Sequence, residues 1–382
     1  MRSNNGFAAL LIALLLALCY PAQSQEWTWT TETVDASGAF SALVIDSGGN
    51  VHMGYLSPEG GGTKYAFRSA ATGRWFTTIV DKGNGVVNLA LDKHERPHLC
   101  YVPYSTLKYA RWDGSGWQIQ EIAPGSGSRE FSCGIAIDAD DAPHVTWYQL
   151  TDTANGYFVH IRHAVLKNGA WRARTLDTSW ETGKWNNVRI DSRGAVYVSY
   201  SAFKDRALRC AINSAKDEWL VTTIEDGKVG RKEETTPGMG NSMVLDKNGR
   251  PNFSYRDENS LRYAWPDGDH WRIDVIDPNA NPFGNLSWVN QRTSLALDSE
   301  GRPHIAYETD GALKHAWWDG TKWKIQAMGI SGPQHRYPAL TISRDNVIFL
   351  AYSAPEDGSM RVLVGKPSQP KPAVTQVQSS NK

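Results

Sequence analysis

The sequence has little cysteine, no net charge and no long apolar run beyond its first residues. Its 382 residues include four cysteines, and basic and acidic side chains balance at 40 each. Without an excess of positive charge, we expect neither nucleic acid nor an anionic membrane surface as a partner. No CxxC or Cys/His spacing indicates zinc, so we expect no metal and no cofactor. No segment shows a helical apolar period over three turns, which argues against a helical fold.

The one long apolar run lies at the N-terminus. Residues 7–18 follow Arg2, are too short to span a bilayer comfortably, and precede the small-residue sequence "AQS". This order is typical of a secretory signal peptide. The alternative is a lipoprotein box ending at Cys19, although Leu18 before it is larger than such sites usually accept. We therefore predict a signal peptide over residues 1–24, a secreted or periplasmic protein, and no membrane insertion.

Three cysteines remain after this cleavage: Cys100, Cys133 and Cys210. An odd number in an exported protein leaves at least one free thiol. Each lies in a predicted strand, so we expect three small buried side chains. A contact between Cys100 and Cys133 of neighbouring repeats fits this reading, and the sequence leaves open whether the two are bonded.

One phrase recurs along the rest of the chain. "SLALDSEGRPHIAY" at 294–307 returns as "NLALDKHERPHLCY" at 88–101 and as "SMVLDKNGRPNFSY" at 242–255. A fixed period of this kind indicates a repeat architecture. The aspartate that ends the first apolar stretch, called the marker below, identifies six copies, and Ser343 takes its place in a seventh. The marker positions are Asp46, Asp92, Asp138, Asp191, Asp246, Asp298 and Ser343.

Each copy contains four segments that read as strands. The segment ending at the marker is followed by a polar turn and a second segment that ends in an aromatic residue. A third segment carries a basic residue, and a tight turn, often "DG", precedes a fourth that often begins with Trp. Four antiparallel strands at this period describe a propeller blade. We predict an all-β fold, a single seven-bladed β-propeller over residues 25–367 with four-stranded antiparallel blades.

The two ends of the chain complement each other. The seventh copy stops after its third strand, "SMRVLVGK", and residues 27–35, "WTWTTETVD", form a strand without a blade. We predict that this N-terminal strand completes blade seven and closes the ring, which leaves no open sheet edge. Residues 368–382 are polar and Pro-rich, so we predict a disordered tail.

The phrases D-x-x-G-x-P-H-x-x-Y and D-G-x-x-W resemble those of secreted bacterial propellers of the sialidase-like or BNR-like kind. The resemblance covers essentially the whole mature chain. It implies the propeller fold and a range of activities that includes glycoside hydrolases, polysaccharide lyases, lectins and binding scaffolds. The turns "WDGSGW" and "WWDGTKW" lack the leading Ser of the sialidase box S-x-D-x-G-x-x-W.

Residues present in every blade do not define a single site. We expect the basic residues of the third strands and the aromatic residues that end the second strands to pack blade against blade, the alternative being a charged ring. The basic residues are Lys64, Lys108, Arg162, Arg209, Arg262, Lys314 and Arg361. The aromatic residues are Tyr55, Tyr101, Trp147, Tyr200, Tyr255, Tyr307 and Tyr352.

Four histidines share the start of the second strand: His52, His98, His144 and His304. A ring of imidazoles would suggest a metal, but the other three blades have Tyr197, Asn252 and Phe349 at this place. The position lies across a short hairpin from the marker aspartate. We therefore expect a structural His–Asp hydrogen bond.

Departures from the repeat indicate where a site lies. The connections between second and third strands, and between blades, are long and irregular, and in a propeller they share one face. Arg256 and Glu308 follow the second-strand aromatics of adjacent blades, the 277–292 loop joins those blades, and the 329–337 loop comes from the next junction. We expect these segments to border one pocket. The candidate substrate-binding residues are Trp147, Tyr148, Trp185, Arg256, Trp288, Arg292, Arg336 and Tyr337, and the candidate catalytic residues are Glu308 and His335.

Aromatic rings beside Arg and Glu suit a sugar, and an arginine-rich cluster favours an acidic one. We predict a monomeric protein that acts on an extracellular polysaccharide or glycan as a hydrolase or lyase. The alternative is a non-catalytic scaffold that binds a glycan or a protein. Sequence does not separate the two, because catalysis depends on an acid and a base facing each other across the pocket.

Overall fold

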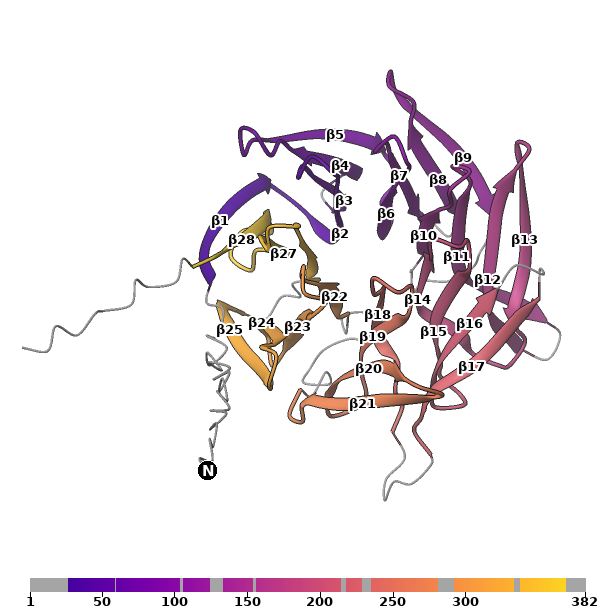
Figure 1. Ribbon diagram of the computed structural model, residues 1–382. Coiled ribbons are helices and arrows are strands. Elements are labelled where there is room, and N and C mark those ends of the chain that lie inside the picture. Colours follow the sequence, from indigo (N-terminus) through magenta and orange to yellow (C-terminus); the bar gives the residue numbers. More distant parts are fainter. Residues whose placement is uncertain are drawn as a thin grey trace, which may run out of the picture.

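The computed structural model describes residues 27–58, 60–103, 106–123, 133–153, 156–213, 218–228, 235–280, 292–332 and 337–368. All regular secondary structure within these residues is β, in seven four-stranded sheets. Figure 1 shows the sheets as blades around a common centre, with the first strand of each blade innermost and the fourth at the rim. The predicted seven-bladed β-propeller is confirmed.

Consecutive strands make up the first six blades. Blade one consists of β2 (Ala39–Ile45), β3 (Val51–Ser57), β4 (Gly62–Arg68) and β5 (Trp75–Asp81). Blade two consists of β6 (Val87–Leu91), β7 (Pro97–Tyr101), β8 (Leu107–Trp112) and β9 (Trp117–Ala123). Blade three consists of β10 (Cys133–Ile137), β11 (Pro143–Thr153), β12 (Gly156–Lys167) and β13 (Ala170–Asp177). Blade four consists of β14 (Thr182–Ile190), β15 (Val196–Ala202), β16 (Ala207–Asn213) and β17 (Trp219–Asp226). Blade five consists of β18 (Met239–Leu245), β19 (Pro251–Arg256), β20 (Leu261–Asp267) and β21 (His270–Asp277). Blade six consists of β22 (Ser294–Leu297), β23 (Pro303–Thr309), β24 (Ala312–Trp318) and β25 (Trp323–Ser331).

Blade seven joins the two ends of the chain. It contains β26 (Ala339–Ile342), β27 (Ile348–Ser353), β28 (Met360–Pro367) and, as its outer strand, β1 (Trp27–Asp35). In Figure 1 the indigo β1 runs beside the yellow β28, and the two pair antiparallel from Trp27↔Pro367 to Asp35↔Met360. The predicted closure by the N-terminal strand is confirmed.

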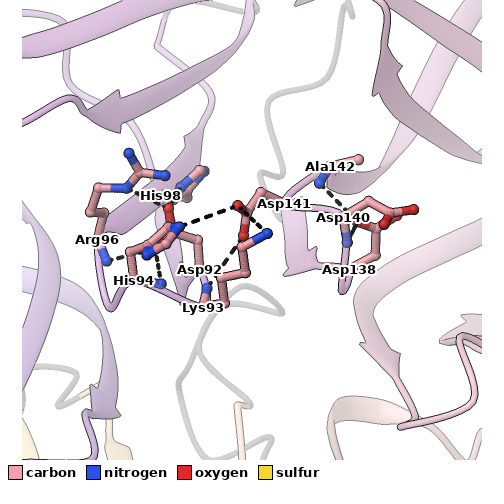
Figure 2. Close-up of polar contacts among 9 residues, drawn as sticks. All are labelled: Asp92, Lys93, His94, Arg96, His98, Asp138, Asp140, Asp141 and Ala142. Atoms are coloured by element: carbon pink, nitrogen blue, oxygen red, sulfur yellow. Dashed lines mark hydrogen bonds and ion pairs between the residues drawn. The ribbon is translucent and has the colours of Figure 1, made fainter.

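The recurring phrase builds the short turn between the first and second strands. Asp92 accepts hydrogen bonds at Oδ1 from the backbone N–H groups of His94 and Arg96, both at 2.9 Å, and its Oδ2 lies 3.3 Å from His98 Nε2 (Figure 2). The same His–Asp contact joins His52 to Asp46 and His144 to Asp138. Burial lowers the pKa of these histidines, which favours the neutral ring. The predicted structural hydrogen bond is confirmed at these three places.

The fourth residue of this turn has a left-handed backbone. Gly301 takes it with φ 80°, as suits glycine, whereas Glu95 and Asp141 both take it with φ 61°. Their side chains reach the preceding blade: Glu95 Oε1 accepts from Ser47 N at 2.7 Å, and Asp141 Oδ2 lies 3.0 Å from Lys93 Nζ (Figure 2). The turns of adjacent blades are therefore linked where glycine is replaced by an acidic residue.

A carboxylate at the end of one blade's outer strand binds two side chains of the next blade. Asp177 accepts hydrogen bonds from Tyr200 Oη at 2.8 Å and from Arg209 Nη1 at 2.9 Å. The expected blade-to-blade packing of the repeated basic and aromatic residues is confirmed at these junctions, with an acidic partner that the pattern did not single out. The other groups of this kind are Asp35 with Tyr55 and Lys64, Asp81 with Tyr101 and Lys108, Glu225 with Tyr255 and Arg262, and Asp277 with Tyr307 and Lys314.

The strands also place the three cysteines of the mature chain and a long hairpin in blade three. Cys100 and Cys133 form a disulfide between blades two and three, and Cys210 is a buried free thiol whose pKa burial raises to about 12. The segment 148–160 continues β11 and β12 as a long hairpin that pairs as far as Thr153↔Gly156. The described residues hold no helix of the length and apolarity needed to cross a membrane.

Candidate functional site

A cavity of about 410 Å³ lies on the axis of the ring. Residues at the innermost strands of all seven blades line it, from Ser41 of β2 round to Ile342 of β26. The described lining residues include two arginines, Arg189 and Arg292, and no acidic side chain. Each innermost strand begins on the face of the long connections, so this face holds one mouth of the cavity.

One repeat position, six residues before the marker, surrounds that mouth. It is occupied by Phe40, Val86, Ser132, Trp185, Gly240, Arg292 and Tyr337, of which Ser132 lies outside the described residues. Strand pairing is irregular here, with register shifts between Ala39 and Ala42 and between Lys184 and Asn187. The side chains at this position therefore leave the regular alternation of the strand.

Three bulky aromatic residues at this position have a left-handed backbone. The φ angle is 50° at Phe40, 51° at Trp185 and 44° at Tyr337, and Gly240 has 59° at the same place. Such a conformation costs about 1–3 kcal/mol for a residue other than glycine, and it concentrates at functional sites. Hydrogen bonds hold it at Trp185, whose carbonyl accepts from Asn241 Nδ2 at 2.7 Å and Asn187 Nδ2 at 3.1 Å.

The aromatic residues and Arg292 share this repeat position around the mouth and are called the mouth cluster: Phe40, Trp185, Arg292 and Tyr337. Trp185 and Arg292 line the cavity. The Phe40 and Tyr337 rings stack with centroids 3.7 Å apart and an interplanar angle of 29°. The cluster therefore joins a cation to aromatic faces, the combination that binds sugars with charged or hydroxyl groups.

Charges near the mouth influence one another. Burial lowers the pKa of Arg292 to about 10, and the neighbouring Tyr337 opposes this change. Burial also raises the pKa of Tyr337 to about 12, with Glu308 raising it further and Arg292 lowering it. Arg292 stays protonated and Tyr337 neutral at neutral pH, so Tyr337 can donate a hydrogen bond there.

The structure brings Arg256 and Glu308 together, but behind the mouth. Arg256 donates from Nη1 to the Glu308 carbonyl at 2.6 Å and from Nη2 to the Ala280 carbonyl at 2.7 Å. Burial lowers the pKa of Arg256 to about 10, with Tyr307 and Glu308 opposing. Arg256 and Glu308 are 1% and 4% exposed, and neither lines the cavity. In this placement Arg256 fastens two blades through main-chain carbonyls.

Trp147 and Tyr148 lie in the core. Trp147 is 2% exposed among the apolar residues between blades two and three, and the Arg162 guanidinium carbon lies 5.8 Å from its ring centroid. Tyr148 is 7% exposed and packs against Gly183. Their side chains face neighbouring blades and contribute nothing to the lining of the cavity. Trp288, His335 and Arg336 lie outside the described residues.

Arg189, a residue of the cavity, was missed from the sequence. Arg189 lines the cavity two residues before a marker, where the other blades have Val44, Ala90, Ala136, Val244, Ala296 and Thr341. Comparison of the innermost strands alone would have singled it out as a departure from the repeat.

A second feature is a group of exposed aromatic rings on blades three and four, in which Trp180 stands out from the repeat in the sequence and Phe158 does not. Phe158 and Trp180 are 43% and 48% exposed, with ring centroids 6.4 Å apart. Lys204 Nζ lies 4.7 Å from the Trp180 centroid. These residues lie at the long-connection end of β12 and β14, on the face that carries the mouth cluster.

No group of three or more His, Cys, Asp or Glu side chains suited to a metal ion occurs within the described ranges. The polar groups at the mouth are guanidinium, phenol and amide groups, which suit an organic or anionic ligand better than a cation.

No protein-family model matches the chain, and no curated protein matches it in sequence. Among solved structures, a mutant puromycin hydrolase complexed with PGG aligns with a TM-score of 0.57 and 13% identity, over 86% of this chain and 53% of its own. This chain thus spans about half the length of that protein. The GH93 α-L-arabinofuranosidase of Fusarium graminearum with arabinobiose aligns at a TM-score of 0.46 and 11% identity, over 90% of this chain and 98% of that one. At such identities the likeness concerns the fold, and the sialidase-like kind stays a prediction.

Proposed function

We propose that the protein is an exported, monomeric, carbohydrate-active propeller with its glycan site at the mouth cluster. The observation that carries this proposal is the set of three strained aromatic residues and one arginine at equivalent positions around one end of the axial cavity. Aromatic faces stack on the C–H surface of a sugar ring, and a guanidinium binds carboxylate or hydroxyl oxygens in pairs. Trp185 would supply the stacking surface and Arg292 the polar contact.

The same surface offers room for a longer chain. Phe158 and Trp180 are exposed on the mouth face, and Lys184 Nζ lies 4.7 Å from the Phe203 ring centroid on the same blade that carries Trp185. A polysaccharide lying across blades three and four would meet these rings before it reaches the mouth. This arrangement supports a polymeric glycan over a free monosaccharide.

For a hydrolase or lyase, an acid and a base must reach the bound sugar. Glu308 is the described candidate, because it acts electrostatically on Tyr337 of the mouth cluster. His335 remains the second proposed catalytic residue, two positions before Tyr337 in the sequence. Glu308 is 4% exposed, so it would reach substrate only through a change at the mouth.

A non-catalytic glycan-binding scaffold is the second candidate function. The described cavity lining contains no carboxylate, whereas paired glycosidase carboxylates stand about 5–9 Å apart across the substrate. This observation favours binding without hydrolysis. Lyase chemistry, which requires one base and neutralisation of a substrate carboxylate, is compatible with fewer acidic residues at the site.

A screen of the purified protein against neutral and acidic polysaccharides tests the proposal. Three readouts separate the candidates: new reducing ends indicate hydrolysis, ultraviolet absorbance of unsaturated uronides indicates a lyase, and co-sedimentation with insoluble polymer or affinity electrophoresis indicates binding alone. We expect an acidic polymer to give a signal. A protein that neither binds nor cleaves any polymer would contradict the proposal.

Export is tested separately. N-terminal sequencing of secreted material should start at Gln25, directly after "AQS". A lipid-modified Cys19 at the start of the mature chain would contradict the proposed soluble, cleaved form.

A further inference from the structure

Arg189 is a charged residue in the described lining of the axial cavity that the proposed function leaves unused. It lies on β14, four residues after Trp185 and one before the strand ends at Ile190. Strands advance roughly 3.3 Å per residue, and the register shift between Lys184 and Asn187 takes up one of the four steps, so the Arg189 backbone lies roughly 10 Å deeper than the mouth cluster. The other six blades have small or apolar residues at this level, from Ala to Val and Thr.

The guanidinium of Arg189 has little to neutralise it. Its hydrogen bond in the described structure runs from Nη1 to the Val188 carbonyl at 2.8 Å, which leaves most of its five N–H donors for other partners. No described carboxylate lies within ion-pair distance of Arg189, and the cavity around it is lined by no acidic residue. Burial lowers the pKa of Arg189 to about 10, with no charged neighbour contributing, and the group stays protonated at neutral pH.

The amides of the wall are already engaged with one another and with the backbone. Asn187 Nδ2 donates to the Asn241 carbonyl at 2.9 Å, and Asn186 Nδ2 donates to the Gly183 carbonyl at 3.0 Å. These bonds hold the inner strands of blades four and five in place around the cavity. The wall is therefore a fixed polar surface, and Arg189 adds a charge-bearing set of donors to it.

Arg189 is half-buried, and a charge that is partly removed from water without a partner is costly, so proteins compensate it with a counter-charge. We propose that Arg189 binds an oxyanion inside the axial cavity, either a free inorganic ion or a carboxylate or sulfate group carried by a ligand. The planar guanidinium matches the two oxygens of such a group. Arg292 at the mouth gives the cavity a second positive charge along the route inward. This site stands whether or not the protein turns over a glycan.

Calorimetric titration at low ionic strength tests the site, with three probes: sodium sulfate, glucuronate and glucose. We expect the wild-type protein to bind sulfate, and Arg189→Gln to weaken binding about ten- to hundredfold. Arg189→Lys keeps the charge without the paired donors and should lie between the two. Arg172→Gln is the matched control, because Arg172 is an exposed arginine on the outer strand β13 and should leave binding unchanged.

The probes also separate the two sources of the anion. Glucuronate that binds through Arg189 while glucose does not indicates a sugar carboxylate, and sulfate binding without glucuronate binding indicates a free inorganic ion. Failure of both anions to bind, or equal binding by wild type and Arg189→Gln, overturns the proposal. Should Arg189→Gln fail to fold, wild-type crystals grown without sulfate and soaked in selenate provide the second measurement. A selenium peak within hydrogen-bond distance of the Arg189 guanidinium is expected, and no peak there overturns the site.

Discussion

Replacing Gly365 with alanine tests the closure of the ring by a steric effect. Gly365 is buried in β28 and pairs with Trp29 of β1. A Cβ atom at this position would lie 2.7 Å from Cζ3 and 2.8 Å from Cη2 of the Trp29 ring, closer than real Cβ contacts. The Trp29 ring in turn packs against His315, with centroids 5.8 Å apart, so it has little room to move away.

The expected cost follows from two opposing effects. Gly365 does not have a left-handed φ, so alanine fits the backbone and by itself would stabilise by about 0.4–1 kcal/mol. Overpacking against the rigid indole costs about 1–3 kcal/mol. We expect a net destabilisation of about 1–2 kcal/mol, seen as a fall of a few degrees in Tm by circular dichroism. Gly116→Ala is the matched control, because its Cβ would meet nothing within 4 Å.

A double-mutant cycle shows whether Trp29 is the cause. In a Trp29→Ala background the clash is gone, so Gly365→Ala should become neutral or stabilising. An equal cost of Gly365→Ala in both backgrounds would refute the packing of β1 on β28. In the wild-type background, a loss of stability for Gly365→Ala no greater than that for Gly116→Ala would also refute this packing.

Three further predictions concern stability. Burial and the adjacent His144 lower the pKa of His163 to about 3 from 6.5, so the unfolded chain binds the extra proton and His163 alone should lower the free energy of unfolding by about 1.4 kcal/mol per pH unit between about pH 6.5 and about pH 3; urea titrations should show a slope smaller by about this amount in His163→Gln, and an unchanged slope would contradict the prediction. Removing the Cys100–Cys133 bond, which closes 33 residues, by double substitution with Ala should lower stability by about 3–4 kcal/mol, and a variant with an unchanged Tm would count against this. Asp177→Asn weakens the contacts to Tyr200 and Arg209 and should destabilise the fold by about 2 kcal/mol, while sulfate binding stays unchanged. Asp269→Asn, at an exposed position, should change neither the stability nor sulfate binding. Equal Tm values for the two variants would contradict the role of Asp177.

The architecture was accessible from the sequence because each blade repeats the same local chemistry. The marker aspartate accepts backbone N–H groups of its own turn and contacts a histidine of the next strand, so Asp92 and His98 recur as a visible pair. Closure was accessible because the unpaired strand 27–35 and the incomplete last copy are visible in the sequence. The outer-strand carboxylates were missed, because Asp177 meets its partners across a blade junction and not within its own phrase.

The site was accessible only in part. Trp185, Arg292 and Tyr337 depart from the repeat and occupy one repeat position around the mouth, whereas Phe40 at the same position is not among the predicted site residues. Arg189 departs from the repeat inside a strand, so a prediction based on charges in the loops does not include it. Aromatic character is no sign of ligand contact at Trp147, where the ring is a core residue. The direction of a side chain at a β-bulge depends on the backbone geometry, and the amino-acid composition does not specify that geometry.

The central claim, that the mouth cluster binds a glycan, is tested most directly by comparing two tryptophan substitutions. Binding of the polysaccharide found in the screen would be measured by calorimetry for Trp185→Ala, which removes a ring from the cavity lining, and for Trp112→Ala, which removes a half-buried ring next to the short turn on the opposite face. The account predicts that Trp185→Ala weakens binding at least about tenfold and that Trp112→Ala leaves it unchanged. Equal affinities for the two variants, or a loss confined to Trp112→Ala, would contradict it.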